Sequence, residues 1–276
     1  MNKYKIIATD LDGTLLNSDQ HISPENHKAM EKLNEMGVHI VPSTGRALWE
    51  MPAEVRDLPY VRYIIHTDGA TIYDKQTGKN ISLPMSRAES DKMFEIMKSF
   101  ECTSSVRYDG YCYSDAKEHN MEFYTYNRMS PTYAQHLFKY SKPVENFEQF
   151  CMKELPEIDM ICTFFHTEED RQKCFGIFDS LPEFQTACSV VNNIEVFSSK
   201  AGKGKSLKRL CEILEIDIEN SIAVGDSTND SEALEYAGLS LATDNAYPEL
   251  KEIADKVICH CDDHIMQYIL DHYFDK

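Results

Sequence analysis

Basic residues are scarce in this chain of 276 residues: 28 Lys and Arg stand against 46 Asp and Glu, a formal net charge of -18. A field of that sign repels nucleic-acid backbones and anionic lipid surfaces. We therefore expect neither nucleic acid nor a membrane among the partners of the protein. If its substrate is an anion, the site must supply local positive charge from a metal ion, a few basic side chains or helix N-termini.

Long apolar runs and paired cysteines are also missing. No run approaches the roughly 18 apolar residues of a membrane span, and the nine cysteines, from Cys102 to Cys261, include no CxxC pair. Because no secretory signal precedes them, we expect reduced thiols in a cytoplasmic protein. With 42% hydrophobic and 27% charged residues, the composition is that of a globular protein with a sizeable core.

Alternating strand and helix signals at both ends of the chain predict an α/β fold. Residues 4–41 contain a β-rich run, then a helical pattern, then a second strand-like run. Ser23 is the expected N-cap of the helix, and Gly37 is expected to end it. This order implies a doubly wound, Rossmann-like parallel sheet with right-handed crossovers. Because the same signals return near the C-terminus, residues 1–83 and 192–276 are expected to form one α/β core domain.

The middle of the chain, residues 84–191, differs in character. It is rich in Tyr, Phe, Met and Cys, and strand-like and helix-like runs alternate along it. A region of this size can form a domain of its own. We expect an inserted α+β cap domain, a candidate lid over the edge at which open α/β sheets bind ligands. Within it, the aromatic residues of 108–113 could meet a polyol, but we interpret this stretch as a plain β-hairpin with a two-residue Asp-Gly turn.

Two acidic loops follow predicted strands. Asp10 and Asp12 lie in Asp-Leu-Asp-Gly-Thr after the first strand, and Asp226 and Asp230 lie in Gly-Asp-Ser-Thr-Asn-Asp after a later apolar strand. Singly, each loop could be a turn or a helix cap. Carboxyl ends of parallel strands meet at one edge of a sheet, where two such loops together could hold one magnesium ion.

Two further segments offer groups for an anion. Thr44, in Ser-Thr-Gly-Arg after the second strand, can donate a hydroxyl hydrogen bond, and the next amide can add another. Lys203, in Lys-Ala-Gly-Lys-Gly-Lys, would supply the positive charge that the chain as a whole lacks. Singly, such segments are most often a turn and a solvated loop.

In their order and strand context, these segments resemble the four motifs of the haloacid dehalogenase superfamily. More narrowly, they resemble the Cof-type phosphatases, whose large α/β cap is inserted between the second and third motifs. The resemblance covers both parts of the predicted core, whereas for the cap it rests on size and position only. It implies hydrolysis of a small-molecule phosphate monoester, such as a sugar phosphate or similar metabolite, through an aspartyl-phosphate.

The resemblance also implies a role for each residue. Asp10 would be the nucleophile, and Asp12 would protonate the leaving oxygen and then activate the water that releases phosphate. Mg²⁺ would be held by Asp10, the Asp12 backbone carbonyl and Asp226, while Asp230 would orient the waters of the metal. The phosphate oxygens would be held by the Leu11 amide, Thr44, Gly45, Lys203 and Asn229.

The chain departs from the family at one place. Where the family usually has Asn-Gly-Ala after the third strand, this sequence has Asp68 followed by Gly and Ala. Asp68 could still turn the chain, but the departure leaves open whether an amide contact from this position to a substrate exists. By contrast, Asn245 is present near the end of the chain, where it is expected to shape the loop beside the metal.

Two other functions remain as alternatives. Residues 199–206 miss a P-loop only at its first glycine, so a P-loop nucleotide-binding enzyme would use Lys205 and Ser206. That alternative leaves the first acidic loop without a function. A catalytically silent phospholigand-binding protein would have no use for the second carboxylate of that loop.

Residues 259–264 are all Cys, His or Asp, the residue types that bind metals, but the sequence has no second ligand pair at zinc-site spacing. We interpret them as a strand end that leads into a helix N-cap. The physiological substrate and the choice between a monomer and a small homo-oligomer are left open by the sequence.

Overall fold

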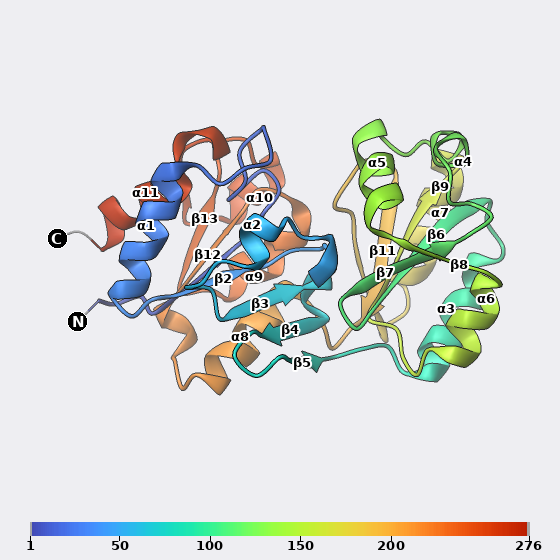
Figure 1. The fold of residues 1–276 in the computed structure, drawn as a ribbon, viewed down its shortest axis with the longest axis horizontal. Coiled ribbons are helices and arrows are strands. Elements are labelled where there is room, and N and C mark those ends of the chain that lie inside the picture. The colour runs from blue at the N-terminus through green and yellow to red at the C-terminus, as the bar shows by residue number, and fades with distance from the viewer. Residues whose placement is uncertain (1, 275–276) are drawn as a thin grey trace. The chain divides into compact units, whose positions relative to one another are not determined.

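The computed structural model describes residues 2–274 of the chain, which fold into two compact units (Figure 1). Unit 1 comprises residues up to 45, residues 51–81 and residues from 202 onward, and unit 2 comprises Arg46–Glu50 and Ser82–Ala201. The chain therefore passes between the units four times.

Unit 1 is built on a five-stranded parallel sheet. The order of its strands is β14, β13, β12, β1, β2, and the central strand β1 pairs in parallel with both β12 and β2. All residues of β1 are buried, as expected for a strand covered on both faces. The strands are β1 (Ile6–Thr9), β2 (His39–Pro42), β12 (Ser221–Gly225), β13 (Leu239–Ala242) and β14 (Lys256–Val257).

A three-stranded sheet follows β2 and consists of β3 (Tyr63–His66), β4 (Thr71–Asp74) and β5 (Lys79–Ser82). Strands β3 and β4 are antiparallel, and all of the sheet except Ser82 belongs to unit 1. An isolated parallel bridge joins Ser43 to Ile65. This bridge places the end of β3 beside the loop that follows β2.

The helices of unit 1 cover the parallel sheet. The side chain of Ser23 accepts a hydrogen bond from the backbone N–H of Asn26, and Gly37 follows the first helix with a φ of 79°, so the expected helix boundaries are confirmed. The doubly wound α/β fold is confirmed as well. The helices are α1 (Pro24–Glu35), α2 (Ala53–Arg56), α8 (Lys203–Ile213), α9 (Ser231–Tyr236), α10 (Pro248–Ile253) and α11 (Ile265–Tyr273).

Unit 2 contains a mostly antiparallel six-stranded sheet with its own apolar core. The order of its strands is β10, β11, β9, β6, β7, β8. They are β6 (Cys102–Tyr108), β7 (Tyr111–Asp115), β8 (Lys142–Val144), β9 (Met160–Phe165), β10 (Phe184–Ala187) and β11 (Asn193–Ser198). Its helices are α3 (Arg87–Met97), α4 (Met121–Tyr126), α5 (Pro131–Tyr140), α6 (Phe147–Gln149) with the π-helical turn Phe150–Glu154, and α7 (Glu168–Asp179).

The expected hairpin at residues 108–113 is present. Strands β6 and β7 are antiparallel neighbours, and the two residues between them, Asp109 and Gly110, have φ values of 49° and 77°. Both angles are positive, as a type I′ turn requires. The interpretation as a plain hairpin is confirmed.

Three segments lie in a different unit from the one the sequence suggested. Residues 82–83 and 192–201 were expected in the core but belong to unit 2, where β11 pairs antiparallel with β9 and β10. A short apolar run does not reveal which sheet it joins. The segment Arg46–Glu50 belongs to unit 2 as well, because Glu50 forms an ion pair with Arg107 and Trp49 stacks on Tyr111.

No helix in the described part of the chain is long and apolar enough to cross a membrane. The nine cysteines all lie among the described residues, and each is a free thiol.

Candidate active site

The candidate site lies in unit 1, in loops at the carboxyl ends of β1, β2 and β12. Asp10 directly follows β1, and its backbone N–H donates to Val224 O at 2.9 Å. Ser43 N–H donates to Thr9 O at 2.8 Å, which fixes the start of the loop after β2. Ligands of open α/β sheets bind at this edge.

Lys203 joins two of the predicted carboxylates. Its Nζ lies 2.7 Å from Asp10 Oδ1 and 2.7 Å from Asp230 Oδ1. Lys203 and Asp230 are each 2% exposed and Asp10 is 6% exposed. Asp10, Asp226 and Asp230 each offer one oxygen, and these oxygens lie within 4.8 Å of one another. Residues far apart in the sequence therefore meet here.

Burial dominates the electrostatics of this cluster. It raises the pKa of Asp10 well above its usual value; attraction to Lys203 opposes that shift, and repulsion from Asp230 and Asp226 adds to it. Burial, with repulsion from Asp230, raises the pKa of Asp226 to about 7. Burial would lower the pKa of Lys203, but attraction to Asp10 and Asp230 outweighs it and raises that pKa above 10.5.

The donor set fits a hard divalent cation. Three carboxylates against one ammonium leave the cluster with excess negative charge, and all its potential ligand atoms are oxygens. A bound cation would offset the repulsion that, in addition to burial, raises the pKa of Asp10 and of Asp226. This cluster can therefore hold a metal ion.

Two glycines allow the carboxylates to approach the backbone. A Cβ at Gly13, whose φ is +75°, would lie 2.5 Å from Asp226 Oδ2. A Cβ at Gly225 would lie 2.4 Å from Asp230 Oδ2, which instead accepts hydrogen bonds from the N–H groups of Asp226 and Ser227 at 3.1 and 3.2 Å. Steric exclusion of a Cβ by these carboxylates thus explains why both acidic motifs contain a glycine at this place.

The first acidic loop turns tightly. Leu11 is fully buried, and its carbonyl accepts hydrogen bonds from the N–H groups of Thr14 and Leu16. The hydroxyl of Thr14 donates to Asp226 Oδ1 at 3.3 Å. Asp12 is half-buried and lies close enough to Asp10 to raise the pKa of that residue. The turn thus brings both carboxylates of the motif to the same edge of the sheet.

The loop after β2 is held by the loop after β3. Thr44 N–H donates to Ile65 O at 3.0 Å, and Thr44 O accepts from Asp68 N–H at 3.1 Å. Asp68 Oδ1 accepts from Asn229 Nδ2 at 3.0 Å, and a Cβ at Gly45 would lie 3.1 Å from the same oxygen. The residue at which the chain departs from the family pattern therefore contacts two residues predicted to hold phosphate.

The arrangement at the start of α8 does not favour the P-loop alternative. The N–H groups of Gly204 and Lys205 both donate to Glu232 Oε2 at 3.1 Å, and Lys205 Nζ pairs with Glu232 Oε1 at 2.5 Å. Ser206 Oγ donates to Gly69 O at 2.6 Å. The groups that would bind a nucleotide phosphate are thus occupied by a carboxylate and a carbonyl of the protein itself.

Asn245 supports the first acidic loop from the other side. Its Nδ2 donates to Gly13 O at 2.7 Å, and its Oδ1 accepts from Cys261 N–H at 2.9 Å. The expectation that Asn245 shapes this loop agrees with these contacts.

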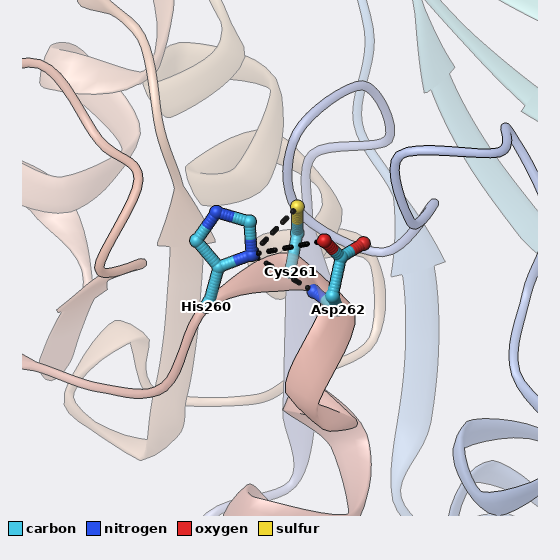
Figure 2. A group of neighbouring side chains, drawn as sticks. All are labelled: His260, Cys261 and Asp262. Carbon is cyan, nitrogen blue, oxygen red and sulfur yellow. Dashed lines mark hydrogen bonds and ion pairs between the residues drawn. The ribbon is translucent and has the colours of Figure 1, made fainter.

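The neighbouring group His260, Cys261 and Asp262 (Figure 2) forms a cap. His260 Nδ1 accepts from the N–H of Asp262 at 3.2 Å and lies 3.6 Å from Cys261 Sγ. Asp262 also accepts hydrogen bonds from the N–H and hydroxyl of Ser18. Since the Nδ1 lone pair accepts this backbone proton, His260 caps the turn Cys261–Asp263, so the expected cap is confirmed. The strand, however, ends before this segment, at Val257.

Comparison with known proteins gives the family. Residues 7–269 match the model of the haloacid dehalogenase-like hydrolases. The chain belongs to this family. It is 31% identical to a Bacillus subtilis protein named 5-amino-6-(5-phospho-D-ribitylamino)uracil phosphatase YwtE, over 97% of each chain. It is 29% identical to Phosphatase YwpJ of the same organism, over 97% of this chain and 99% of that protein.

Among solved structures, a haloacid dehalogenase-like hydrolase from B. subtilis superposes with a TM-score of 0.83 at 27% identity, covering 97% of this chain and 99% of the other. The chain is therefore a hydrolase of the haloacid dehalogenase superfamily, as its motifs indicated. Sequence reasoning missed Thr14, Glu232 and the contacts of Asp68. Each of these residues forms its hydrogen bond with a residue far away in the sequence, so no local pattern could have identified it.

Proposed function

We propose that the protein is a magnesium-dependent phosphatase that hydrolyses a small phosphorylated metabolite through an aspartyl-phosphate on Asp10. The observation that carries the proposal is the position of Lys203 between Asp10 and Asp230, beside Asp226. A buried ammonium within an all-oxygen cluster supplies the charge that a phosphoryl group needs and that the chain as a whole lacks.

In the proposed reaction, an oxygen of Asp10 attacks phosphorus, and the bond from phosphorus to the leaving oxygen breaks. Asp12 gives its proton to that oxygen. Asp12 then takes a proton from water, whose oxygen attacks phosphorus while the bond to Asp10 breaks. Inorganic phosphate leaves, and both carboxyl groups return to their starting states.

Mg²⁺ would be held by Asp10, Asp226 and the backbone carbonyl of Asp12, with Asp230 orienting its waters. When bound, it neutralises charge between the nucleophile and the incoming phosphate. Burial raises the pKa of Asp10, and attraction to the Lys203 ammonium opposes that rise and so favours the ionised nucleophile. Loss of this ammonium would raise the pKa of Asp10 further and would make the carboxyl group a poorer nucleophile.

The remaining predicted residues surround the same loops. The Leu11 amide, Thr44, Gly45, Lys203 and Asn229 would hold the phosphate oxygens. The pairing of Thr44 with the loop after β3 supports this assignment, because the pairing fixes the Thr44 backbone.

The substrate class is proposed as a phosphorylated sugar, polyol or similar metabolite. One relative is named for a phosphoribityl substrate, and the net charge of -18 disfavours polyanionic polymers. Unit 2 is proposed to determine which metabolite is accepted. A cytoplasmic location is proposed as well, supported by the nine free thiols.

The proposal is tested by trapping the intermediate. Asp12→Ala keeps the nucleophile but removes the group that activates water, so an activated aryl phosphate should leave phosphate attached to Asp10. Mass spectrometry of the rapidly quenched variant locates the modification, and Asp10→Asn serves as the unreactive control. Phosphate on a Ser, Cys or His would reject the assignment.

A further inference from the structure

Asp68 carries an unusual buried oxygen. The residue is 2% exposed and sits in the turn Thr67–Gly69 with a φ of 48°. Its Oδ1 accepts from Asn229 Nδ2 at 3.0 Å, whereas its Oδ2 is buried and has no hydrogen-bond partner among the described residues. A buried carboxylate oxygen without a partner costs free energy of folding, so its presence at this position needs a functional explanation.

The contacts of Asn229 show what Asp68 controls. Asn229 Oδ1 accepts from Ser227 Oγ at 2.5 Å, while its Nδ2 faces Asp68. Both ends of the amide are therefore fixed. Since Nδ2 carries two hydrogens, one remains to be donated to a phosphate oxygen.

Asp68 also places negative charge among the other groups proposed to bind phosphate. A Cβ at Gly45 would lie 3.1 and 3.2 Å from the two carboxylate oxygens. Burial lowers the pKa of Lys203, but attraction to Asp10 and Asp230 outweighs burial and raises it. Attraction to Asp68 makes a further, smaller contribution in the same direction. A phosphate held by Gly45, Lys203 and Asn229 would therefore lie near a fixed carboxylate.

We propose that Asp68 is a positioning residue that orients Asn229 toward the phosphate and, through its negative charge, keeps the affinity of the site for inorganic phosphate low. The consequence is rapid release of the product. An asparagine at this position would preserve the hydrogen bond to Asn229 but would remove the charge. This inference rests on the proposed function for its role in turnover.

Two substitutions separate the hydrogen bond from the charge. Asp68→Asn keeps an acceptor for Asn229 Nδ2, and asparagine tolerates a positive φ. Asp68→Gly removes the acceptor and the charge without adding backbone strain. Asp271→Asn, in an exposed position of α11, makes the same change in net charge and is the matched control.

The affinity for inorganic phosphate is measured by isothermal titration calorimetry in the presence of Mg²⁺. A unit charge a few ångströms from an anion, at an effective dielectric constant of about 20, changes affinity by about tenfold or more. Asp68→Asn should therefore bind phosphate at least about tenfold more tightly than the wild-type protein, and Asp271→Asn should match the wild type. Phosphate affinity of Asp68→Asn within about twofold of wild type would overturn the charge role.

Turnover of an aryl phosphate tests the positioning role. In Asp68→Asn, KM and the inhibition constant for phosphate should fall together, whereas Asp68→Gly should lose about tenfold or more in kcat/KM relative to Asp68→Asn because Asn229 is no longer held. Equal kcat/KM in the two variants would overturn positioning. If the wild-type protein hydrolyses no ester, the proposed function fails, and the calorimetric comparison still decides the inference about charge.

Discussion

Glu50 and Arg107 form an ion pair in the interior of unit 2, and removing one partner should destabilise that unit strongly. The side chains are 0% and 3% exposed, respectively. Arg107 donates from Nε to Glu50 Oε2 at 3.2 Å and from Nη2 to Oε1 at 3.3 Å. Glu50 also accepts from Ala47 N–H at 2.8 Å and lies 3.6 Å from His136 Nε2. The carboxylate thus joins the short segment Arg46–Glu50 to the sheet and to α5.

The magnitude follows from the burial of both charges. In Glu50→Gln the side-chain volume is retained, but the guanidinium of Arg107 is left buried without an opposite charge, at a cost of about 3–5 kcal/mol in the free energy of unfolding. Glu169→Gln is the control, because its pair with Lys173 in the same unit is 75% and 59% exposed. That change should cost less than about 1 kcal/mol.

Fluorescence can follow unit 2 selectively. Trp49 is the one tryptophan of the sequence, and it stacks on Tyr111 within unit 2 at a centroid distance of 5.7 Å. Urea unfolding monitored by this tryptophan should therefore shift to a markedly lower midpoint in Glu50→Gln. If its shift is no larger than that of Glu169→Gln, the argument from burial is refuted.

The contribution of Glu50 should depend on pH in one direction. Burial by itself raises the pKa of Glu50, but attraction to Arg107 and the hydrogen bonds from His136 and Ala47 outweigh burial and hold that pKa well below 4.5. A group whose pKa is depressed on folding stabilises the protein above its unfolded pKa. The stability gap between the wild-type protein and Glu50→Gln should be full above pH 4.5 and should narrow as the pH falls below it.

Three further predictions concern the candidate site. Removal of divalent metal with EDTA should abolish phosphatase activity and added Mg²⁺ should restore it; full activity in the stripped protein would contradict the proposed metal. Lys203→Ala should lose about a thousandfold or more in kcat, whereas Lys205→Ala should be mild, and the reverse order would favour a P-loop. Gly13→Ala and Gly37→Ala should each destabilise the protein by about 1–2 kcal/mol, because both glycines have positive φ. A Cβ at Gly13 would contact Asp226, whereas a Cβ at Gly37 would contact none of the described residues, so equal loss of metal affinity in the two variants would refute this steric argument.

The sequence predicted those parts of the molecule that depend on local pattern. Ser23 and Gly37 mark the ends of a helix because capping and left-handed backbone are local requirements. The acidic loops were placed correctly at one edge because parallel strands share a direction. Once Asp10 and Asp226 were assigned to strand ends, their proximity followed from the topology.

Contacts between distant residues could not be predicted in the same way. The pairing of Glu50 with Arg107 and of Asp68 with Asn229 depends on which loops pack together, and periodicity contains no such information. The same limit explains why β11 was assigned to the wrong unit, because Ile194 to Phe197 have the composition of a buried strand in either unit. Glu232 was missed because a glutamate inside a helix gives no sign that it caps another helix.

The order of the strands in unit 1 has a consequence for synthesis on the ribosome. Strand β1 lies between β2, which is made soon after it, and β12, which is made only after the whole of unit 2. Unit 2 can form its sheet and core once Ser198 has left the ribosome. Strand β1, by contrast, keeps one unpaired edge until β12 (Ser221–Gly225) has been synthesised. Parallel pairing over such a separation is slow. We therefore expect unit 1 to complete its fold last, with one edge of its central strand β1 exposed to other nascent chains for most of translation.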